Sequence, residues 1–155
     1  MTDAPPVLNQ INLVVRNMDA MVDFYRTLGV DIADATPPWQ EWDPHHRTAS
    51  TIGGLDFDLD SAGFAGQWNQ GWPAGRTGAV LGFGLATRVA VDATYAKLVD
   101  AGYADQQPPY DAFWGARYAV VVDPEGNAVG LMSPVDPAMQ SAPPPPPDEE
   151  SRTPR

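Results

Sequence analysis

Alternating polar and apolar positions predict strands near the start of the chain and again just before residue 61. Residues 7–15 are mostly apolar, with Gln10 and Asn12 together on one face of the predicted strand. Residues 55–60 alternate strictly, so that Leu55, Phe57 and Leu59 share one face and Asp56, Asp58 and Asp60 share the other. Another short strand is expected over residues 47–52. Each of the two alternating strands therefore has one polar face.

A helix is predicted between these strands, from Asn17 to Gly29. Its apolar residues recur at helical spacing: Met18, Met21, Val22, Tyr25 and Leu28. Asn17 is a suitable N-cap, and the helix dipole favours the negative charge of Asp19 in the first turn. Gly29 is a suitable C-terminal stop because glycine adopts the left-handed conformation that commonly ends a helix.

The same order of elements recurs in the second half of the chain. Residues 80–86 predict a strand, Thr87 can cap a helix that runs to about Ala101, and Gly102 ends it. Two antiparallel strands then flank the turn Asp123-Pro124-Glu125-Gly126-Asn127, where proline fixes φ and Gly126 tolerates a positive φ. A strand–helix–strands unit used twice, about 70 residues apart, predicts an α+β fold.

The predicted elements divide the chain into five segments. These are an N-terminal lead (residues 1–6), a first module (7–62), a glycine-rich linker (63–78), a second module (79–136) and a tail (137–155). The tail is expected to be disordered, because Pro143–Pro147 favour polyproline II and the charged residues that follow have no apolar face.

Composition limits the kinds of partner that the protein can bind and the cellular location that we expect for it. A formal net charge of −11 disfavours nucleic acid, because phosphate would be repelled. With no cysteine, disulfides, thiolate metal sites and a cysteine nucleophile are excluded. No apolar run approaches the roughly 20 residues that a membrane span needs, and no secretory pattern opens the chain. We therefore expect a cytoplasmic protein that does not enter membranes.

Three segments, in this order, resemble the vicinal oxygen chelate superfamily, which includes glyoxalase I, extradiol dioxygenases and bleomycin-resistance proteins. They are Leu8-Asn9-Gln10-Ile11-Asn12-Leu13-Val14-Val15, Asp23-Phe24-Tyr25 with Leu28-Gly29, and Trp114-Gly115 with Asp123-Pro124-Glu125-Gly126-Asn127. The resemblance covers about residues 7–135. It implies two βαβββ modules whose curled mixed sheets surround a shared cleft, and it implies a homodimer, since relatives often form dimers.

Metal-dependent relatives hold one divalent ion in that cleft, so the resemblance also implies where ligands should lie. The first ligand position corresponds to Gln10, whose amide oxygen can bind a hard cation, and the second is best matched by Asp58. The third should lie on the strand over residues 80–86, which offers no ligand. The fourth corresponds to Gly130, which has no side chain. Two of the four positions therefore cannot coordinate a metal.

Two further groups of residues are candidates for the cleft. His45 and His46 follow Asp43-Pro44 in a loop, and adjacent side chains of an extended chain point in opposite directions, so both rarely reach one ion. Aromatic residues gather in loops or at their edges, where flat rings suit a flat or cationic ligand. The predicted ligand-binding residues are Gln10, Asn12, Trp39, Trp42, Asp58, Phe83, Phe113 and Trp114.

The leading hypothesis is a metal-independent small-molecule binding protein, similar to the drug-sequestering relatives that confer antibiotic resistance. It would need no cofactor and would capture an aromatic or cationic ligand. The alternative is a lyase, isomerase or dioxygenase with one divalent metal ion held by Gln10, Asp58 and either His45 or His46. A third hypothesis gives the acidic surface or the proline-rich tail a role in recruiting a partner.

Overall fold

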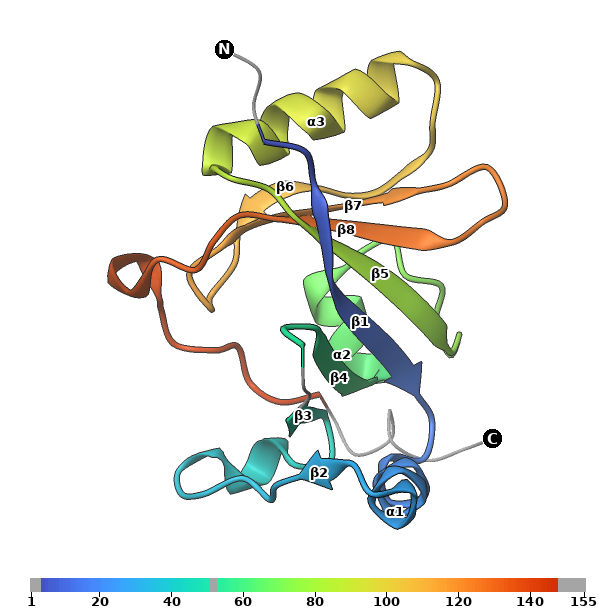
Figure 1. Ribbon diagram of the computed structural model, residues 1–155, viewed down its shortest axis with the longest axis vertical. Helices are drawn as coiled ribbons and strands as arrows, with labels where there is room; N and C mark the ends of the chain where they lie inside the picture. Colours follow the sequence, from blue (N-terminus) through green and yellow to red (C-terminus); the bar gives the residue numbers. More distant parts are fainter. Residues whose placement is uncertain (1–3, 51–52, 148–155) are drawn as a thin grey trace.

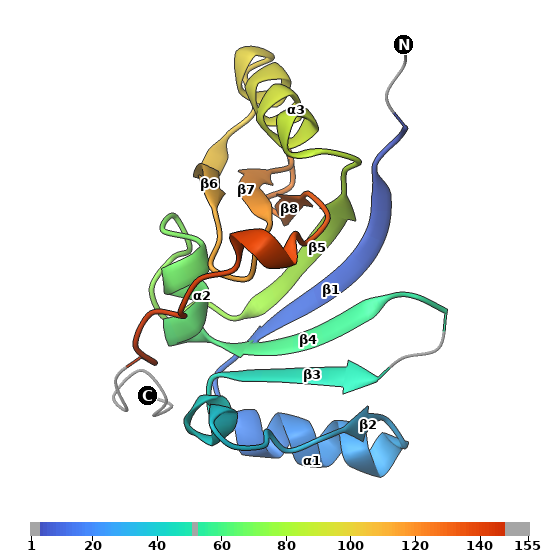
Figure 2. The same ribbon diagram turned by 90° about the vertical axis from the view of Figure 1, so that its left-hand side faces the viewer.

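One mixed sheet of eight strands runs through the computed structural model, which describes residues 4–50 and 53–147. The strands are ordered β2-β3-β4-β1-β5-β8-β7-β6. Strands β1 and β5 pair antiparallel at the centre and join two halves that repeat the same strand order outward. Figure 2 shows the sheet curving strongly, so that one of its faces is concave.

Each half is one βαβββ module. The first comprises β1 (Val7–Val15), α1 (Met18–Leu28), β2 (Asp31–Ile32), β3 (His46–Ser50) and β4 (Asp56–Ser61). The second comprises β5 (Gly78–Gly84), α3 (Arg88–Asp100), β6 (Asp105–Asp111), β7 (Arg117–Val122) and β8 (Ala128–Met132). In both modules the first and last strands pair in parallel, and the remaining pairs are antiparallel. The predicted α+β fold with two such modules is confirmed.

Local sequence signals explain where the two module helices begin and end. The side chain of Asn17 accepts a hydrogen bond from the Ala20 N–H (3.1 Å), and that of Thr87 accepts one from the Ala90 N–H (3.0 Å). Gly29 follows α1 with a φ of 108°, a left-handed conformation that costs glycine little. Among the described residues, none of the helices has the length and apolar character needed to cross a bilayer.

The two faces of the sheet bury different sets of residues. Helices α1 and α3 lie at opposite ends of the long axis (Figure 1). Met18 and Val22 of α1 pack with Leu59 of β4, while Val91 of α3 packs with Leu131 of β8. Side chains alternate along a strand, so the residues next to Leu59 and Leu131 in sequence point to the other face, which is the concave one. A third cluster, rich in aromatic residues, lies on that side.

The predicted linker contains a helix that periodicity alone did not predict. Helix α2 (Ala62–Trp68) begins directly after β4, where the side chain of Ser61 accepts a hydrogen bond from the Phe64 N–H (3.1 Å). Phe64, Ala65 and Trp68 are buried, which gives this short helix one apolar face against the concave side of the sheet. A short 3₁₀ turn, η1 (Trp39–Trp42), lies between β2 and β3.

The predicted disordered tail follows a defined path as far as residue 147. It contains the 3₁₀ turn η2 (Pro137–Met139), and the Ser141 N–H then donates to the Phe113 carbonyl (2.9 Å). Farther on, the Gln67 side chain of α2 donates to the Pro145 carbonyl (3.0 Å). These bonds join residues 137–147 to the loop before β7 and to α2, and the disorder of the tail stays a prediction. Residues 148–155 lie outside the described part of the chain.

Candidate functional site

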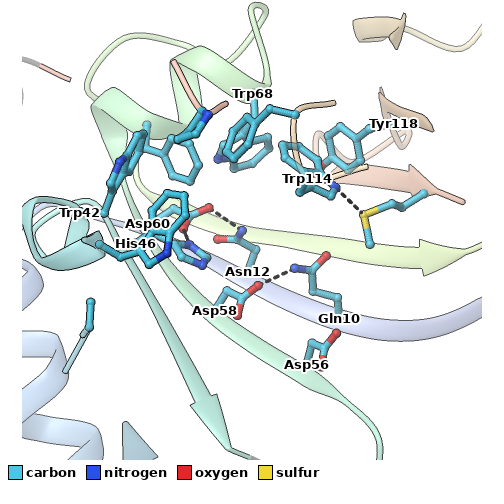
Figure 3. Close-up of a pocket in the computed structure, with 16 residues that line it drawn as sticks. Gln10, Asn12, Trp42, His46, Asp56, Asp58, Asp60, Trp68, Trp114 and Tyr118 are labelled. Carbon is cyan, nitrogen blue, oxygen red and sulfur yellow. Dashed lines mark hydrogen bonds and ion pairs between the residues drawn. The ribbon is translucent and has the colours of Figure 1, made fainter. Parts of the chain in front are cut away.

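A cavity of about 420 Å³ lies on the concave side of the sheet, between the two modules. Its polar lining residues are Gln10, Asn12, His46, Asp56, Asp58 and Asp60. Its aromatic lining residues are Trp39, Trp42, Phe64, Trp68, Phe113, Trp114 and Tyr118, and Ala35, Met132 and Pro143 complete the lining. Figure 3 shows the labelled acids and amides on adjacent strands on one side of the cavity, opposite Trp68, Trp114 and Tyr118. We call the side formed by Gln10, Asn12, Asp56, Asp58 and Asp60 the polar floor. We call the aromatic lining residues together the aromatic wall.

The polar floor is built by parallel pairing of β1 with β4. Alternation places Gln10 and Asn12 of β1 on the same face as Asp58 and Asp60 of β4. The Gln10 Nε2 donates to Asp58 Oδ2 (2.7 Å), and the Asn12 Nδ2 donates to Asp60 Oδ2 (2.7 Å). Each amide is therefore oriented by a carboxylate on the neighbouring strand.

His46 extends this network from the start of β3. Its Nδ1 lies 2.5 Å from Asp60 Oδ1, and its Nε2 lies 3.2 Å from the Thr48 hydroxyl. Burial lowers the pKa of His46, but the charge and hydrogen bond of Asp60 and the charge of Asp58 outweigh burial and raise this pKa to about 9. At neutral pH the imidazolium therefore offsets one of the carboxylates of the floor.

Asp58 is a buried carboxylate whose charge is only partly compensated. It is only 8% exposed, and burial followed by the nearby charge of Asp60 raises its pKa, against the opposing effects of His46 and of two hydrogen-bond donors. Its Oδ1 has no hydrogen-bond partner within the described residues. A buried carboxylate oxygen without a donor is costly, so this atom has unused capacity to accept a hydrogen bond.

The aromatic wall contains two groups of edge-to-face contacts. Trp68 and Trp114 both approach the ring of Tyr118, with centroid distances of 6.0 and 5.5 Å and interplanar angles of 82° and 70°. At the other end, Trp42 packs against Phe64 at 5.1 Å. Because these rings are already held in place by one another, a ligand that contacts them would pay little cost in ordering.

Gln10 and Asp58 lie together, but the other metal positions implied by the resemblance carry no ligating side chain. In the register of the sheet, Gln10 lies beside Gly82, and Gly82 lies beside Gly130. A Cβ added at Gly82 would lie 2.8 Å from the Gln10 Cβ, and one added at Gly130 would lie 2.8 Å from the Tyr118 hydroxyl. Gln10 and Tyr118 therefore occupy the space that two ligating side chains would need. Among the described residues, no three His, Asp or Glu side chains are grouped to hold a metal ion.

Seven of the eight predicted ligand-binding residues line the cavity. The exception is Phe83, which the structure does not place among the lining residues. The reason is strand parity, because Gly82 faces Gln10 and its neighbour Phe83 must point to the other face of β5.

The side chains of His45 and His46 point in different directions, as expected for adjacent residues of an extended chain. His46 lines the cavity, whereas His45 is 3% exposed and its Nδ1 lies 3.1 Å from the Ser61 hydroxyl. His45 is not among the lining residues, so the structure does not bring it into the cavity with Gln10 and Asp58. It contributes instead to the junction between β4 and α2.

Several lining residues were not predicted, although some of them carried a usable signal. Phe64 and Trp68 are four residues apart after Ser61, a capped amphipathic turn in the sequence. Tyr118 and Met132 follow from strand parity once the closing hairpin is placed, because they are cross-strand partners on the concave face. Pro143 carried no signal, since a proline run indicates extended chain and not where that chain packs.

Comparison with known proteins identifies the scaffold. A sequence profile for the Glyoxalase/Bleomycin resistance protein/Dioxygenase superfamily matches residues 7–131. Among curated proteins, none matches the sequence. Solved structures of similar fold include an NAD-dependent benzaldehyde dehydrogenase from Legionella pneumophila, with a TM-score of 0.58 and 19% identity over 81% of this chain and 97% of that one.

Two other solved structures are similar in fold. The Mn(II)-bound glyoxalase from Novosphingobium aromaticivorans has a TM-score of 0.57 and 16% identity over 86% of this chain, which spans 40% of that protein. Methylmalonyl-CoA epimerase from Mycobacterium tuberculosis has a TM-score of 0.51 and 16% identity over 83% of this chain and 88% of that one. At these identities the likeness establishes the fold alone.

Proposed function

This chain belongs to the Glyoxalase/Bleomycin resistance protein/Dioxygenase superfamily, and we propose that it is a metal-independent small-molecule binding protein within it. The observation that carries the proposal is the row Gln10–Gly82–Gly130 across the sheet. Two of its three residues have no side chain, and the space beside them is filled by Gln10 and Tyr118. The donor set for a divalent ion is therefore incomplete, while the aromatic wall is fully formed.

The proposed mechanism is stoichiometric capture. A flat ring would lie against Trp39, Trp42 and Trp114, and its polar groups would reach Gln10, Asn12 and Asp58 on the floor. A volume of about 420 Å³ is in the usual range for pockets that enclose small organic molecules. Antibiotics with a flat aromatic system are one class of molecule that this arrangement would sequester.

The direct test is ligand binding by protein from which metal has been removed. Chelator-treated protein would be titrated with proflavine, a flat cation, and 2-naphthol, a flat neutral molecule, using calorimetry and tryptophan quenching. We expect saturable binding of one molecule per chain, unchanged by added divalent metal. Binding that appears only after metal is added would contradict the proposal.

A matched control variant is Phe24→Ala, which removes an exposed aromatic ring on α1, outside the cavity lining. Its affinities should equal those of the unmodified protein. The homodimer and the cytoplasmic location stay predictions; light scattering at several concentrations tests the first, and fractionation of the producing cells tests the second.

A further inference from the structure

The cavity contains a specific set of unused hydrogen-bonding atoms. Among the described residues, four buried side-chain atoms lack a partner, and three of these belong to cavity-lining residues: Asn12 Oδ1, Asp58 Oδ1 and Trp68 Nε1. Buried polar groups in folded proteins nearly always have a hydrogen-bond partner. Three atoms without one at a single cavity therefore indicate that a ligand supplies their partners.

The two atoms of the polar floor that lack a partner, Asn12 Oδ1 and Asp58 Oδ1, are both acceptors, and the hydrogen bonds of the floor explain why. Asn12 must turn its amide N–H toward Asp60, which accepts it at 2.7 Å, so its oxygen faces away from that carboxylate. Asp58 receives the Gln10 amide on Oδ2 and keeps Oδ1 open. Asn12 and Asp58 are direct partners in the β1–β4 register, so the two open acceptors lie on neighbouring side chains.

The charges of the floor favour a cation there. Asp60 is already paired with His46 and Asn12, whereas Asp58 has no cationic partner within hydrogen-bonding distance among the described residues. Asp58 is also more than nine-tenths buried, so water screens its charge poorly. A positive group with N–H donors would satisfy both the charge and the open oxygens.

From these atoms we infer that the ligand carries a protonated amidine, guanidine or primary amine, whose N–H groups donate to Asp58 and Asn12. The inference rests on the proposed function, since it concerns the ligand of the same cavity. It goes further by requiring N–H donors and not positive charge alone. Aromatic rings by themselves would accept a quaternary ammonium equally well. The open Nε1 of Trp68 adds a preference for a hydrogen-bond acceptor on the body of the ligand.

Three small probes separate these requirements. Benzamidine has a ring, a charge and N–H donors; phenyltrimethylammonium has the ring and the charge but no N–H; benzamide has the ring and N–H donors but no charge. We expect benzamidine to bind the unmodified protein at least about tenfold more tightly than either of the others, as charge-assisted hydrogen bonds require. Equal affinity for phenyltrimethylammonium, or for benzamide, would overturn the inference.

Two matched variants test whether the preference for benzamidine depends on Asp58. Asp58→Asn should weaken benzamidine about tenfold and bring its affinity close to that of benzamide. Asp100→Asn removes the same charge from an exposed position on α3 and should change neither affinity. Circular dichroism checks folding, and the three-probe comparison on the unmodified protein stands without any variant.

The outcomes also separate this inference from the proposed function. If 2-naphthol binds saturably but benzamidine has no advantage over the other two probes, the donor requirement fails and capture by the aromatic wall stands. If neither proflavine, 2-naphthol nor any of the three probes binds, the proposed function itself fails.

Discussion

The two modules share their order of elements but differ sharply in what they present to the cavity. Strands β1 and β4 of the first module contribute two amides and three carboxylates. The equivalent strands of the second module, β5 and β8, present Gly82 and Gly130 beside them. Both modules contribute aromatic rings, and those of the second come from Tyr118 on β7 and from Phe113 and Trp114 before it.

This difference separates the residues that form the fold from those that form the site. Capping and chain reversal recur in both halves, with Asn17 and Thr87 beginning the helices and Gly29 and Gly102 ending them. The side chains on the concave face do not recur. A metal held between the modules would need ligands from both halves, so a scaffold that keeps polar groups in one half only is suited to another use of the same cleft.

The largest expected effect comes from adding a side chain to the second module. Gly130→Ala places a Cβ against the Tyr118 hydroxyl and should lower the free energy of unfolding by about 1–3 kcal/mol, as overpacking does. In the double variant Gly130→Ala with Tyr118→Phe, much of that loss should be recovered, because the closest atom is removed. Urea denaturation measures both values.

Gly66→Ala is the control for this change. Gly66 lies in α2, and a Cβ there would meet nothing within 4 Å, so alanine should not destabilise the protein. Strictly additive effects of Gly130→Ala and Tyr118→Phe would show that Tyr118 does not fill the space beside Gly130.

The aromatic wall is tested by removing one exposed ring. Trp39 is 50% exposed yet lines the cavity, so Trp39→Ala should weaken 2-naphthol roughly 2- to 10-fold with little change in stability. Phe83→Ala, on the opposite face of the sheet, should leave the affinity unchanged. Calorimetry measures both, and an equal loss in the two variants would contradict the assigned geometry.

The polar floor predicts a pH dependence of stability. The folded-state pKa of His46, about 9, lies above its ordinary value of 6.5, so its contribution is fully present below pH 6.5 and is lost as pH rises through 9. Because 40% of the side chain is exposed, the free energy of unfolding should fall by only about 1 kcal/mol over this range. His46→Gln should flatten that decline; an unchanged slope in denaturation curves would show that the pair with Asp60 does not carry it.

The smallest effect is expected from the tail. Pro143 lines the cavity, so a chain ending at Gln140 should release ligand a few-fold faster while its melting temperature changes little. A chain ending at Pro147 keeps every described tail contact and should release ligand at the original rate. Stopped-flow quenching measures both rates, and identical release from the two truncated chains would remove Pro143 from the account.

Sequence patterns predicted the fold well because its signals are local. Caps, glycine stops and the turn at Asp123–Asn127 each act over a few residues. The strict alternation of residues 55–60 correctly placed Asp56, Asp58 and Asp60 on one face, and all three line the cavity.

The site was less predictable where it depends on register and on long-range packing. Phe83 was predicted to bind the ligand, but a one-residue step along a strand reverses the face to which a side chain points. Gln10 fills the space beside Gly82 because β1 pairs with β5, a strand distant in sequence. The path of residues 140–147 over α2 is likewise set by contacts that no local pattern encodes.

Metal stoichiometry tests the central claim most directly. Purified protein would be incubated separately with Mn, Fe, Co, Ni and Zn, dialysed, and its bound metal measured by elemental analysis. The incomplete donor set predicts far less than one tightly bound ion per chain for every metal. Close to one ion per chain would contradict the account, and it would make Gln10, Asp58 and His46 the first residues to substitute.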